Sequence, residues 1–339
     1  MATGFVGRNW KFLATLAGFA VVRELIQRRK FIVLQGKVVL ITGGSRGFGL
    51  AMAEEFAKEG AKLVLCSRED DELERAQTKL TEYGTDVLTI QCDVTQPEQV
   101  QQMMTQATAH FGQIDILVNN AGIISAGPWH TLTRSDFEES MNIIFWGNYN
   151  TTMAILPQMQ ARGNGRIVNI ASVGGKVSVP HLLSYASAKF AVVGLSEGLH
   201  AELAQEGIDV ITVAPGLMRT GSQVNAIAKG DKNKEEYTLF ALVDTLPGSS
   251  ISVQRAAKQV VNATRRGDTE LIITASAQIL ARLHGAFPGL ITDILTISAR
   301  FLPKGEGTVR HLGRESETPI SKSFLTTLGQ KASQEYNEL

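Results

Sequence analysis

Short runs of aliphatic and β-branched residues alternate in this chain with longer stretches of helical periodicity, and this alternation restricts the fold most. Seven apolar runs are expected to form strands: residues 38–41, 63–65, 87–90, 114–118, 166–170, 210–213 and 271–273. Helices are expected over residues 47–59, 70–83, 97–111, 135–160, 184–206 and 253–266. Apolar strands separated by amphipathic helices form parallel sheets that are covered on both faces. The pattern therefore predicts an α/β fold with a doubly wound, parallel, seven-stranded sheet (a Rossmann fold) over residues 36–275.

An N-terminal extension, residues 1–35, precedes this domain. It contains an apolar stretch, residues 12–22, flanked by Lys11 and Arg23. A helix needs about 20 apolar residues to cross a bilayer, so this stretch is too short. Its length also suits a signal peptide, but residues 18–20 match a cleavage site only loosely. We expect a helix that either packs on the domain or lies on a membrane surface.

A C-terminal extension, residues 276–339, follows the domain. Apolar residues recur at helical spacing from 277 to 302, and Pro288-Gly289 divides them into two helices. These helices are expected to cap the domain or to form a dimer surface, and contact with a membrane is the alternative. Beyond Pro303 the chain becomes polar and rich in glycine, which predicts a loosely ordered tail.

Composition excludes several classes of protein. Lys plus Arg and Asp plus Glu both number 33, and no long basic tract occurs, so nucleic acid is not an expected partner. The two cysteines, Cys66 and Cys92, lie in apolar runs and are interpreted as buried structural thiols. The six histidines lack the paired spacing of a zinc site, so no metal is predicted. This cysteine usage favours a reducing, cytoplasmic location.

A glycine-rich turn follows the first predicted strand, directly before a predicted helix. It reads Thr42-Gly43-Gly44-Ser45-Arg46-Gly47-Phe48-Gly49. Glycines 43, 47 and 49 allow a tight turn and close approach of a pyrophosphate, which the N-terminus of the helix attracts. The spacing differs from the general G-x-G-x-x-G fingerprint, but the strand, turn and helix are the context that a dinucleotide site requires.

The end of the second predicted strand favours NADP(H) over NAD. An acidic residue there binds the ribose 2′-hydroxyl of NAD, whereas this chain has Ser67 at that position and Arg68 next. Arg46 adds a second guanidinium, and two such groups suit a 2′-phosphate by charge and geometry. The acidic residues 69–71 oppose this interpretation, and two solvated surface arginines are the alternative.

Tyr185 and Lys189 are spaced i and i+4 at the start of a predicted helix, so they share one face. A free tyrosine has a pKa of about 10, and a neighbouring ammonium lowers it by favouring the phenolate. Ser172 follows the strand 166–170 and can place its hydroxyl beside the same reacting oxygen. Together with the glycine turn, these residues predict a site for acid–base catalysis.

These motifs resemble those of the classical short-chain dehydrogenases/reductases across the predicted sheet domain. The family's T-G-x-x-x-G-x-G is present as Thr42 to Gly49, its N-N-A-G as Asn119 to Gly122, and its Y-x-x-x-K as Tyr185 to Lys189. Asp93-Val94 after the third strand and the P-G-x-x-x-T run from Pro215 to Thr220 complete the set. Five motifs in order at compatible spacing make the resemblance specific.

The resemblance implies roles for these residues. Tyr185 would donate or accept the proton, Lys189 would lower the pKa of Tyr185 and hold the nicotinamide ribose, and Ser172 would bind the substrate oxygen. The cofactor groove would be lined by Asp93 and Val94 beside the adenine, by Asn119, Ala121 and Gly122, and by Pro215, Gly216 and Thr220 facing the nicotinamide. Asn119 would cross-link the sheet as much as contact the cofactor. Relatives commonly dimerise through the helices 135–160 and 184–206, so a homo-oligomer is expected.

One position departs from the family pattern. The family often has a fourth catalytic residue, an asparagine on the long helix after the fourth strand, that steadies a proton-relay water. Ile144 stands at the matching position here, and Asn142 lies two residues earlier, which turns it away from that face of a helix. Either a local bulge brings Asn142 into place as a catalytic residue, or the protein lacks the usual relay.

The sequence thus predicts an NADP(H)-dependent oxidoreductase that moves a hydride between the nicotinamide and a carbonyl or alcohol carbon. Residues 217–250 are expected to cover the substrate, and their apolar side chains favour a hydrophobic ketone, aldehyde, retinoid or steroid-like alcohol, although a lid also needs such residues to pack. One alternative is an NADP-binding regulatory or scaffold protein with an impaired relay, suggested by Ile144 and the C-terminal tail. Another is a reductase that its two extensions hold peripherally at a membrane.

Overall fold

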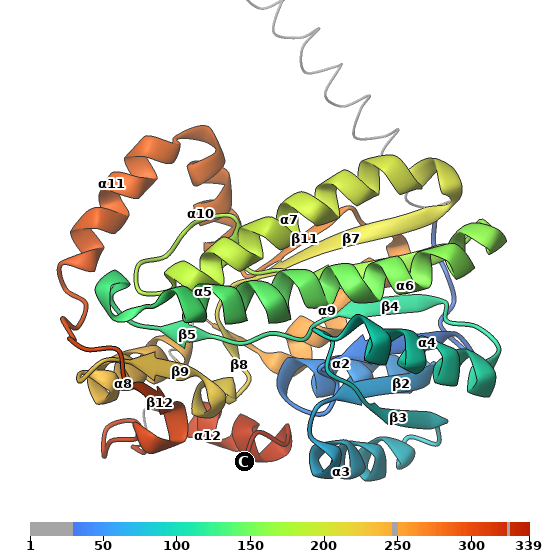
Figure 1. Ribbon diagram of the computed structural model, residues 1–339, viewed down its shortest axis with the longest axis horizontal. Coiled ribbons are helices and arrows are strands. Elements are labelled where there is room, and N and C mark those ends of the chain that lie inside the picture. Colours follow the sequence, from blue (N-terminus) through green and yellow to red (C-terminus); the bar gives the residue numbers. More distant parts are fainter. Residues whose placement is uncertain (1–29, 246–249, 324–325) are drawn as a thin grey trace, which may run out of the picture.

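Seven parallel strands form the main sheet of the computed structural model, which describes residues 30–245, 250–323 and 326–339 (Figure 1). The strands are β1 (Val38–Thr42), β2 (Lys62–Ser67), β3 (Val87–Gln91), β4 (Ile116–Asn119), β6 (Gly165–Ile170), β7 (Ile208–Pro215) and β11 (Glu270–Ile273). Their order is β11-β7-β6-β4-β1-β2-β3, and every pairing is parallel. The predicted fold class is therefore confirmed.

Helices cover both faces of this sheet (Figure 1). They are α2 (Gly47–Lys58), α3 (Asp70–Thr81), α4 (Pro97–Phe111), α6 (Gly147–Arg162), α7 (Leu183–Leu203) and α9 (Val253–Arg266). Buried residues of α2, α3 and α9 share one hydrophobic cluster with the sheet, and those of α4, α6 and the end of α7 share another. Parallel sheets need this double cover because both of their faces are apolar.

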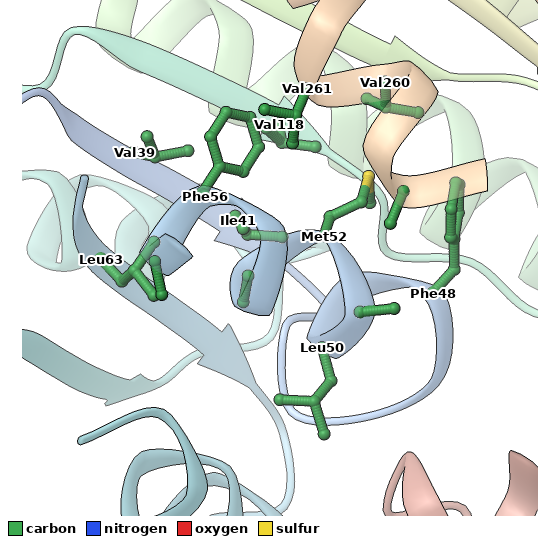
Figure 2. Packing of buried hydrophobic residues seen from close by; sticks show 14 of the residues in the cluster. Val39, Ile41, Phe48, Leu50, Met52, Phe56, Leu63, Val118, Val260 and Val261 are labelled. Atoms are coloured by element: carbon green, nitrogen blue, oxygen red, sulfur yellow. The ribbon is translucent and has the colours of Figure 1, made fainter. Parts of the chain in front are cut away.

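The central strand β1 shows how the sequence pattern builds the core. Val39 and Ile41 point toward α2 and α9, whereas Val38 and Leu40 belong to the cluster on the opposite face, because successive strand residues alternate between faces. Figure 2 shows Phe56 of α2 packed between β1 and α9. Full burial of each such side chain contributes roughly 1.5–3 kcal/mol to folding.

The expected helix 135–160 is wrong as a single α-helix. The structure has α5 (Arg134–Ser140), a π-helical stretch (Met141–Trp146) and then α6. The side chain of Asp136 accepts hydrogen bonds from the N–H and hydroxyl of Thr133, which caps the start of α5. π-Helical turns widen the helix locally and are frequent at functional sites.

The predicted lid forms a small substructure next to the main sheet. It contains β8 (Met218–Arg219), a 3-10 turn (Ser222–Asn225), β9 (Ile227–Lys229), α8 (Asn233–Thr245) and β10 (Ile251–Ser252). Val224, Ile227 and Tyr237, three of its apolar residues, are buried. Much of the lid's apolar character is therefore used in its own packing.

The prediction of a loosely ordered tail beyond Pro303 is wrong. Strand β12 (Arg310–Leu312) pairs antiparallel with β9, which pairs in turn with β5 (Ser125–Ala126). Helix α12 (Thr327–Glu335) follows and leads into Tyr336, whose side chain is fully buried in the cluster of α2 and α9. The polar tail is ordered by backbone pairing and by one buried aromatic ring.

The two helices predicted in the C-terminal extension are present as α10 (Ala275–Ala286) and α11 (Pro288–Ala299). Ile291 of α11 is buried, but seven large apolar side chains on or next to the two helices are exposed: Ile279, Leu283, Phe287, Leu290, Ile294, Ile297 and Phe301. Figure 1 shows α11 standing at the edge of the molecule. These seven exposed side chains therefore do not pack on the domain. Within the described ranges, no helix is both long enough and apolar enough to cross a bilayer.

The N-terminal helix predicted around residues 12–22 lies outside the described residues. From Lys30 the chain runs beside the end of α9, where the N–H of Ile32 donates to the carbonyl of Arg265 at 2.9 Å. Cys66 and Cys92 are free thiols and both are buried, as predicted.

Candidate active site

The glycine turn joins β1 to the N-terminus of α2. Gly43 and Gly47 have φ angles of +61° and +54°, which favour glycine. A Cβ atom at Gly49 would overlap the carbonyl oxygen of Gly43. The side chain of Asn120 donates to that same oxygen at 3.0 Å and fixes the turn. The first turn of α2 holds no acidic residue, so this backbone fits the phosphates of a dinucleotide.

Thr42 and Asn119 hold the neighbouring strand ends together. The hydroxyl of Thr42 accepts hydrogen bonds from the N–H groups of Asn120 and Ala121, at 2.9 and 3.1 Å. The Asn119 amide is only 4% exposed and donates to Oδ1 of Asn169 on β6 at 3.0 Å. Both side chains shape the groove from within the sheet, and Asn119 has the cross-linking role that the resemblance implies.

The other residues predicted to bind the cofactor follow the carboxyl ends of strands, where open α/β sheets bind ligands. They are Asp93 and Val94 after β3, Ala121 and Gly122 after β4, Pro215 and Gly216 at the end of β7, and Thr220 after β8. Asp93 and Arg68 line one hollow next to β2 and β3. Thr220 is buried, and its hydroxyl donates a hydrogen bond to Oγ of Ser222 at 2.7 Å.

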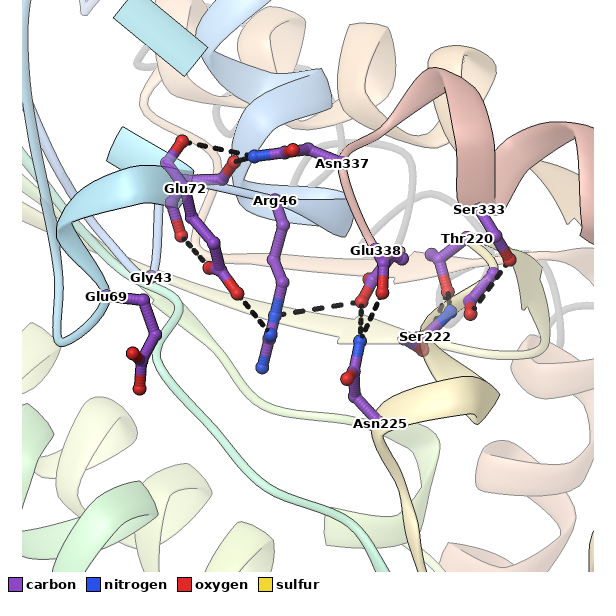
Figure 3. Close-up of polar contacts among 12 residues, drawn as sticks. Gly43, Arg46, Glu69, Glu72, Thr220, Ser222, Asn225, Ser333, Asn337 and Glu338 are labelled. Atoms are coloured by element: carbon purple, nitrogen blue, oxygen red, sulfur yellow. Dashed lines mark hydrogen bonds and ion pairs between the residues drawn. The ribbon is translucent and has the colours of Figure 1, made fainter. Parts of the chain in front are cut away.

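The two arginines predicted to bind a 2′-phosphate have different surroundings. Arg68 is exposed. Arg46 lies between two carboxylates: its Nη1 is 2.6 Å from Oε1 of Glu72, and its Nε is 3.7 Å from Oε2 of Glu338 (Figure 3). Glu72 also accepts a hydrogen bond from Ser45 at 2.8 Å. Arg68 is therefore the guanidinium that is open to a ligand in this structure.

Ser172, Tyr185 and Lys189 come together at the start of α7. The Nζ of Lys189 lies 5.7 Å from the centre of the Tyr185 ring. A Cβ at Gly174 would lie 3.4 Å from both Oγ of Ser172 and Cε1 of Tyr185, which places those two groups side by side. The N–H of Gly174 donates to the Ser172 hydroxyl at 3.0 Å and orients it.

Burial dominates the acid–base properties of this group. It raises the pKa of Tyr185, and the hydrogen bond with Ser172 opposes that increase. Burial also lowers the pKa of Lys189 to about 8, and its Nζ donates to the carbonyl of Ile170 at 2.7 Å. Burial and the Ser172 hydrogen bond therefore act in opposite directions on the pKa of Tyr185, and burial is the larger of the two.

Ile144 occupies the inner face of the π-helical stretch. It is 2% exposed and belongs to a small cluster against which Tyr185 packs. A Cβ at Gly122 would lie 3.8 Å from both Cγ1 of Ile144 and Nζ of Lys189. Asn142 is exposed. The predicted local bulge is present as the π-helical stretch. It does not bring Asn142 inward, because a side chain two positions before Ile144 lies on nearly the opposite face of the helix.

Asn142→Ala is expected to leave kcat within a factor of about two of the unchanged protein. A lost proton-transfer group instead lowers the rate by roughly 10²-fold or more. Steady-state kinetics at saturating cofactor measure the difference. A large decrease in kcat would show that Asn142 turns inward during turnover and acts as the relay residue.

Sequence reasoning did not single out Glu72 and Glu338, which contact the glycine turn at Arg46, or Asn225, which donates to Glu338 (Figure 3). No local motif marks these residues, because each lies far in the sequence from the residue that it contacts. Within residues 30–245, 250–323 and 326–339, no three His, Cys, Asp or Glu side chains are grouped as metal ligands.

A doubly wound parallel sheet with a glycine turn after its first strand, and with Ser172, Tyr185 and Lys189 gathered beside the strand ends, defines a dinucleotide-dependent oxidoreductase. A family profile described as short chain dehydrogenase matches residues 37–230. The chain belongs to the short-chain dehydrogenase/reductase family and is an oxidoreductase of that type, whose members use a nicotinamide cofactor.

Known proteins resemble the chain over most of its length. It is 30% identical over 279 residues to the dehydrogenase/reductase SDR family protein 7-like of Drosophila melanogaster, covering 80% of this chain and 83% of that one. A short-chain dehydrogenase from Streptomyces avermitilis is similar with a TM-score of 0.67 and 28% identity, over 78% of this chain and 98% of that one. An NAD+-bound xylitol dehydrogenase has a TM-score of 0.61 and 26% identity, over 71% of this chain and 98% of that one.

Proposed function

We propose that this protein is an NADP(H)-dependent carbonyl reductase that acts on hydrophobic ketones or aldehydes and interconverts them with the corresponding alcohols. The observation that carries the proposal is the group of Ser172, Tyr185 and Lys189, which lies next to Gly174 and Gly122 and in which Lys189 is buried. When bound, the cofactor supplies the hydride, and the chain supplies the position and the proton.

Each side chain of this group has a part in carbonyl reduction. Tyr185 can donate its phenolic proton to the substrate oxygen, and burial, which raises its pKa, favours the protonated form. The hydroxyl of Ser172 can bind that same oxygen. Lys189 would hold the nicotinamide ribose, as the family resemblance implies.

The preference for NADP(H) rests on the end of β2. Ser67 stands where an acid would bind the ribose of NAD, and Arg68 is exposed next to it. Arg46 supplies a second guanidinium if its carboxylate partners move away. A similar protein, the xylitol dehydrogenase, binds NAD+, so the preference has to be measured for this chain.

Arg68→Asp is expected to weaken NADPH binding by at least about tenfold and to leave NADH binding unchanged or tighter, because a carboxylate repels the 2′-phosphate and can bind a ribose hydroxyl. Titration with both cofactors measures the ratio of their dissociation constants. Arg134→Asp, at an exposed position on α5, is the control. An unchanged ratio in Arg68→Asp would place the 2′-phosphate elsewhere.

A hydrophobic substrate is favoured by the apolar side chain of Ile144 next to Lys189 and Tyr185.

The exposed apolar face of α10 and α11 is the surface through which we propose contact with a second copy or peripherally with a membrane. The two buried, free cysteines support a reducing, cytoplasmic location.

One second function has specific support. Ile144 at the relay position and Glu338 beside Arg46 favour a regulatory or scaffold protein that binds NADP(H) with little turnover. Binding of NADPH and NADH to the purified protein, followed by NADPH oxidation with hydrophobic aldehydes and ketones, separates the two functions. Turnover of any of these compounds supports the reductase, whereas tight binding without turnover supports the regulatory protein.

A further inference from the structure

The last residues of the chain, 336–339, lie on the glycine turn, and we name this segment the C-terminal strap. The N–H of Gly47, at the start of α2, donates to the carbonyl of Tyr336 at 2.8 Å. The side chain of Asn337 donates to the carbonyl of Ser45 at 2.9 Å. The strap thus uses backbone groups of the turn that the proposed function assigns to the cofactor.

Glu338 places a carboxylate directly on the turn (Figure 3). Its Oε1 lies against the Cα of Gly47, where any Cβ would overlap it. Its Oε2 accepts a hydrogen bond from Asn225 at 2.7 Å and lies 3.7 Å from Nε of Arg46. The residue is buried. Because Asn225 belongs to the lid, one carboxylate connects the lid to the cofactor turn.

The surroundings of Glu338 both favour and oppose its negative charge. The N-terminus of α2 favours a negative charge. Arg46 adds a positive charge, but Glu72 at 2.6 Å already neutralises it. A nucleotide phosphate that approached this corner would therefore meet two carboxylates for one guanidinium.

We propose that the C-terminal strap is an autoinhibitory latch, in which the Glu338 carboxylate occupies the anion position of the glycine turn and must leave before a nucleotide phosphate can bind Arg46 and Gly47. The inference rests on the proposed function only in assigning this turn to a phosphate-bearing cofactor. Burial raises the pKa of Glu338 to about 7, so the carboxylate is not strongly stabilised in this position. Once the strap has left, its carboxylate no longer repels a phosphate at Arg46 and Gly47.

The test compares Glu338→Gln with the unchanged protein by calorimetric titration with NADPH and with 2′,5′-ADP, a fragment that carries the 2′-phosphate. The latch predicts that both bind about tenfold more tightly to Glu338→Gln, because one charge–charge repulsion at close range is removed. Glu335→Gln, an exposed position on α12, is the matched control and should bind like the unchanged protein. Equal or weaker binding by Glu338→Gln overturns the latch, and weaker binding would indicate a strap that holds the cofactor in place.

A second measurement keeps the test decisive if Glu338→Gln unfolds. Leu339 is 69% exposed at the end of the strap, so a fluorophore attached to Leu339→Cys reports on movement of the strap in the full chain. Addition of 2′,5′-ADP is expected to increase the mobility of the label, seen as a drop in fluorescence anisotropy. Unchanged anisotropy at saturating 2′,5′-ADP overturns the latch.

Failure of the latch can be distinguished from failure of the proposed function, because both measurements detect binding and neither detects turnover. If NADPH binds more tightly to Glu338→Gln but no carbonyl compound is reduced, the latch is supported and the reductase is not. If carbonyl compounds are reduced and Glu338→Gln binds NADPH like the unchanged protein, the reductase is supported and the latch is overturned. Absence of nucleotide binding in both proteins overturns both.

Discussion

Tyr185→Phe is expected to lower kcat by about 10²- to 10⁴-fold, the range for removal of a positioned proton donor. The phenol oxygen is the group that can donate a proton next to the Ser172 hydroxyl, and Phe keeps the ring that packs in the Ile144 cluster. The dissociation constant for NADPH should stay within about twofold, since only one hydroxyl is removed. Single-turnover oxidation of NADPH with a saturating carbonyl substrate measures the effect.

Tyr149→Phe is the matched control for this variant. Tyr149 is partly exposed on α6 and stacks edge-on with Trp146, away from the Ser172 group. Its variant should keep full activity. Appreciable turnover by Tyr185→Phe would mean that the proton comes from another group, and the catalytic assignment would have to be abandoned.

Lys229→Met should destabilise the protein by about 3–5 kcal/mol, the usual cost of removing one partner of a buried ion pair. Nζ of Lys229 lies 3.0 Å from Oδ2 of Asp136, and the two side chains are 2% and 1% exposed. Without Lys229, Asp136 would remain buried with its charge unpaired. Urea unfolding at neutral pH measures the difference in the free energy of unfolding.

Two further variants identify the cause of this loss. The double variant Asp136→Asn, Lys229→Met should lose less stability than Lys229→Met, because the unpaired charge is absent. Lys232→Met, whose partner Glu235 is exposed, should change stability by less than about 0.5 kcal/mol. A loss of less than about 1 kcal/mol in Lys229→Met would show that water or another group stabilises Asp136.

The pH dependence of the same pair follows from the pKa of Asp136. Burial alone would raise this pKa, but hydrogen bonds from Thr133 and Lys229 outweigh it and hold the pKa below the ordinary value of 3.8. Since the folded-state pKa is depressed, Asp136 contributes stability above pH 3.8 and loses it as the pH falls through the folded-state value.

The sequence determined the main sheet and the grouping of Tyr185 with Lys189, because both depend on local patterns. Alternating apolar runs and helical stretches specify strands covered on two faces, and the i, i+4 spacing puts Tyr185 and Lys189 on one side of α7. The glycine turn is likewise a local feature, since Gly49 has to pass against the carbonyl of Gly43.

The tertiary structure alone decided the contacts between distant segments and the electrostatics of the site. Asp136 of α5 pairs with Lys229 of the lid, and Glu338 near the end of the chain contacts Arg46. Neither pairing has a periodicity or a spacing that a sequence could reveal. The electrostatics of the Tyr185 group have a related origin: spacing places Lys189 nearby, but burial, which raises the pKa of Tyr185 and lowers that of Lys189, is a property of the assembled fold.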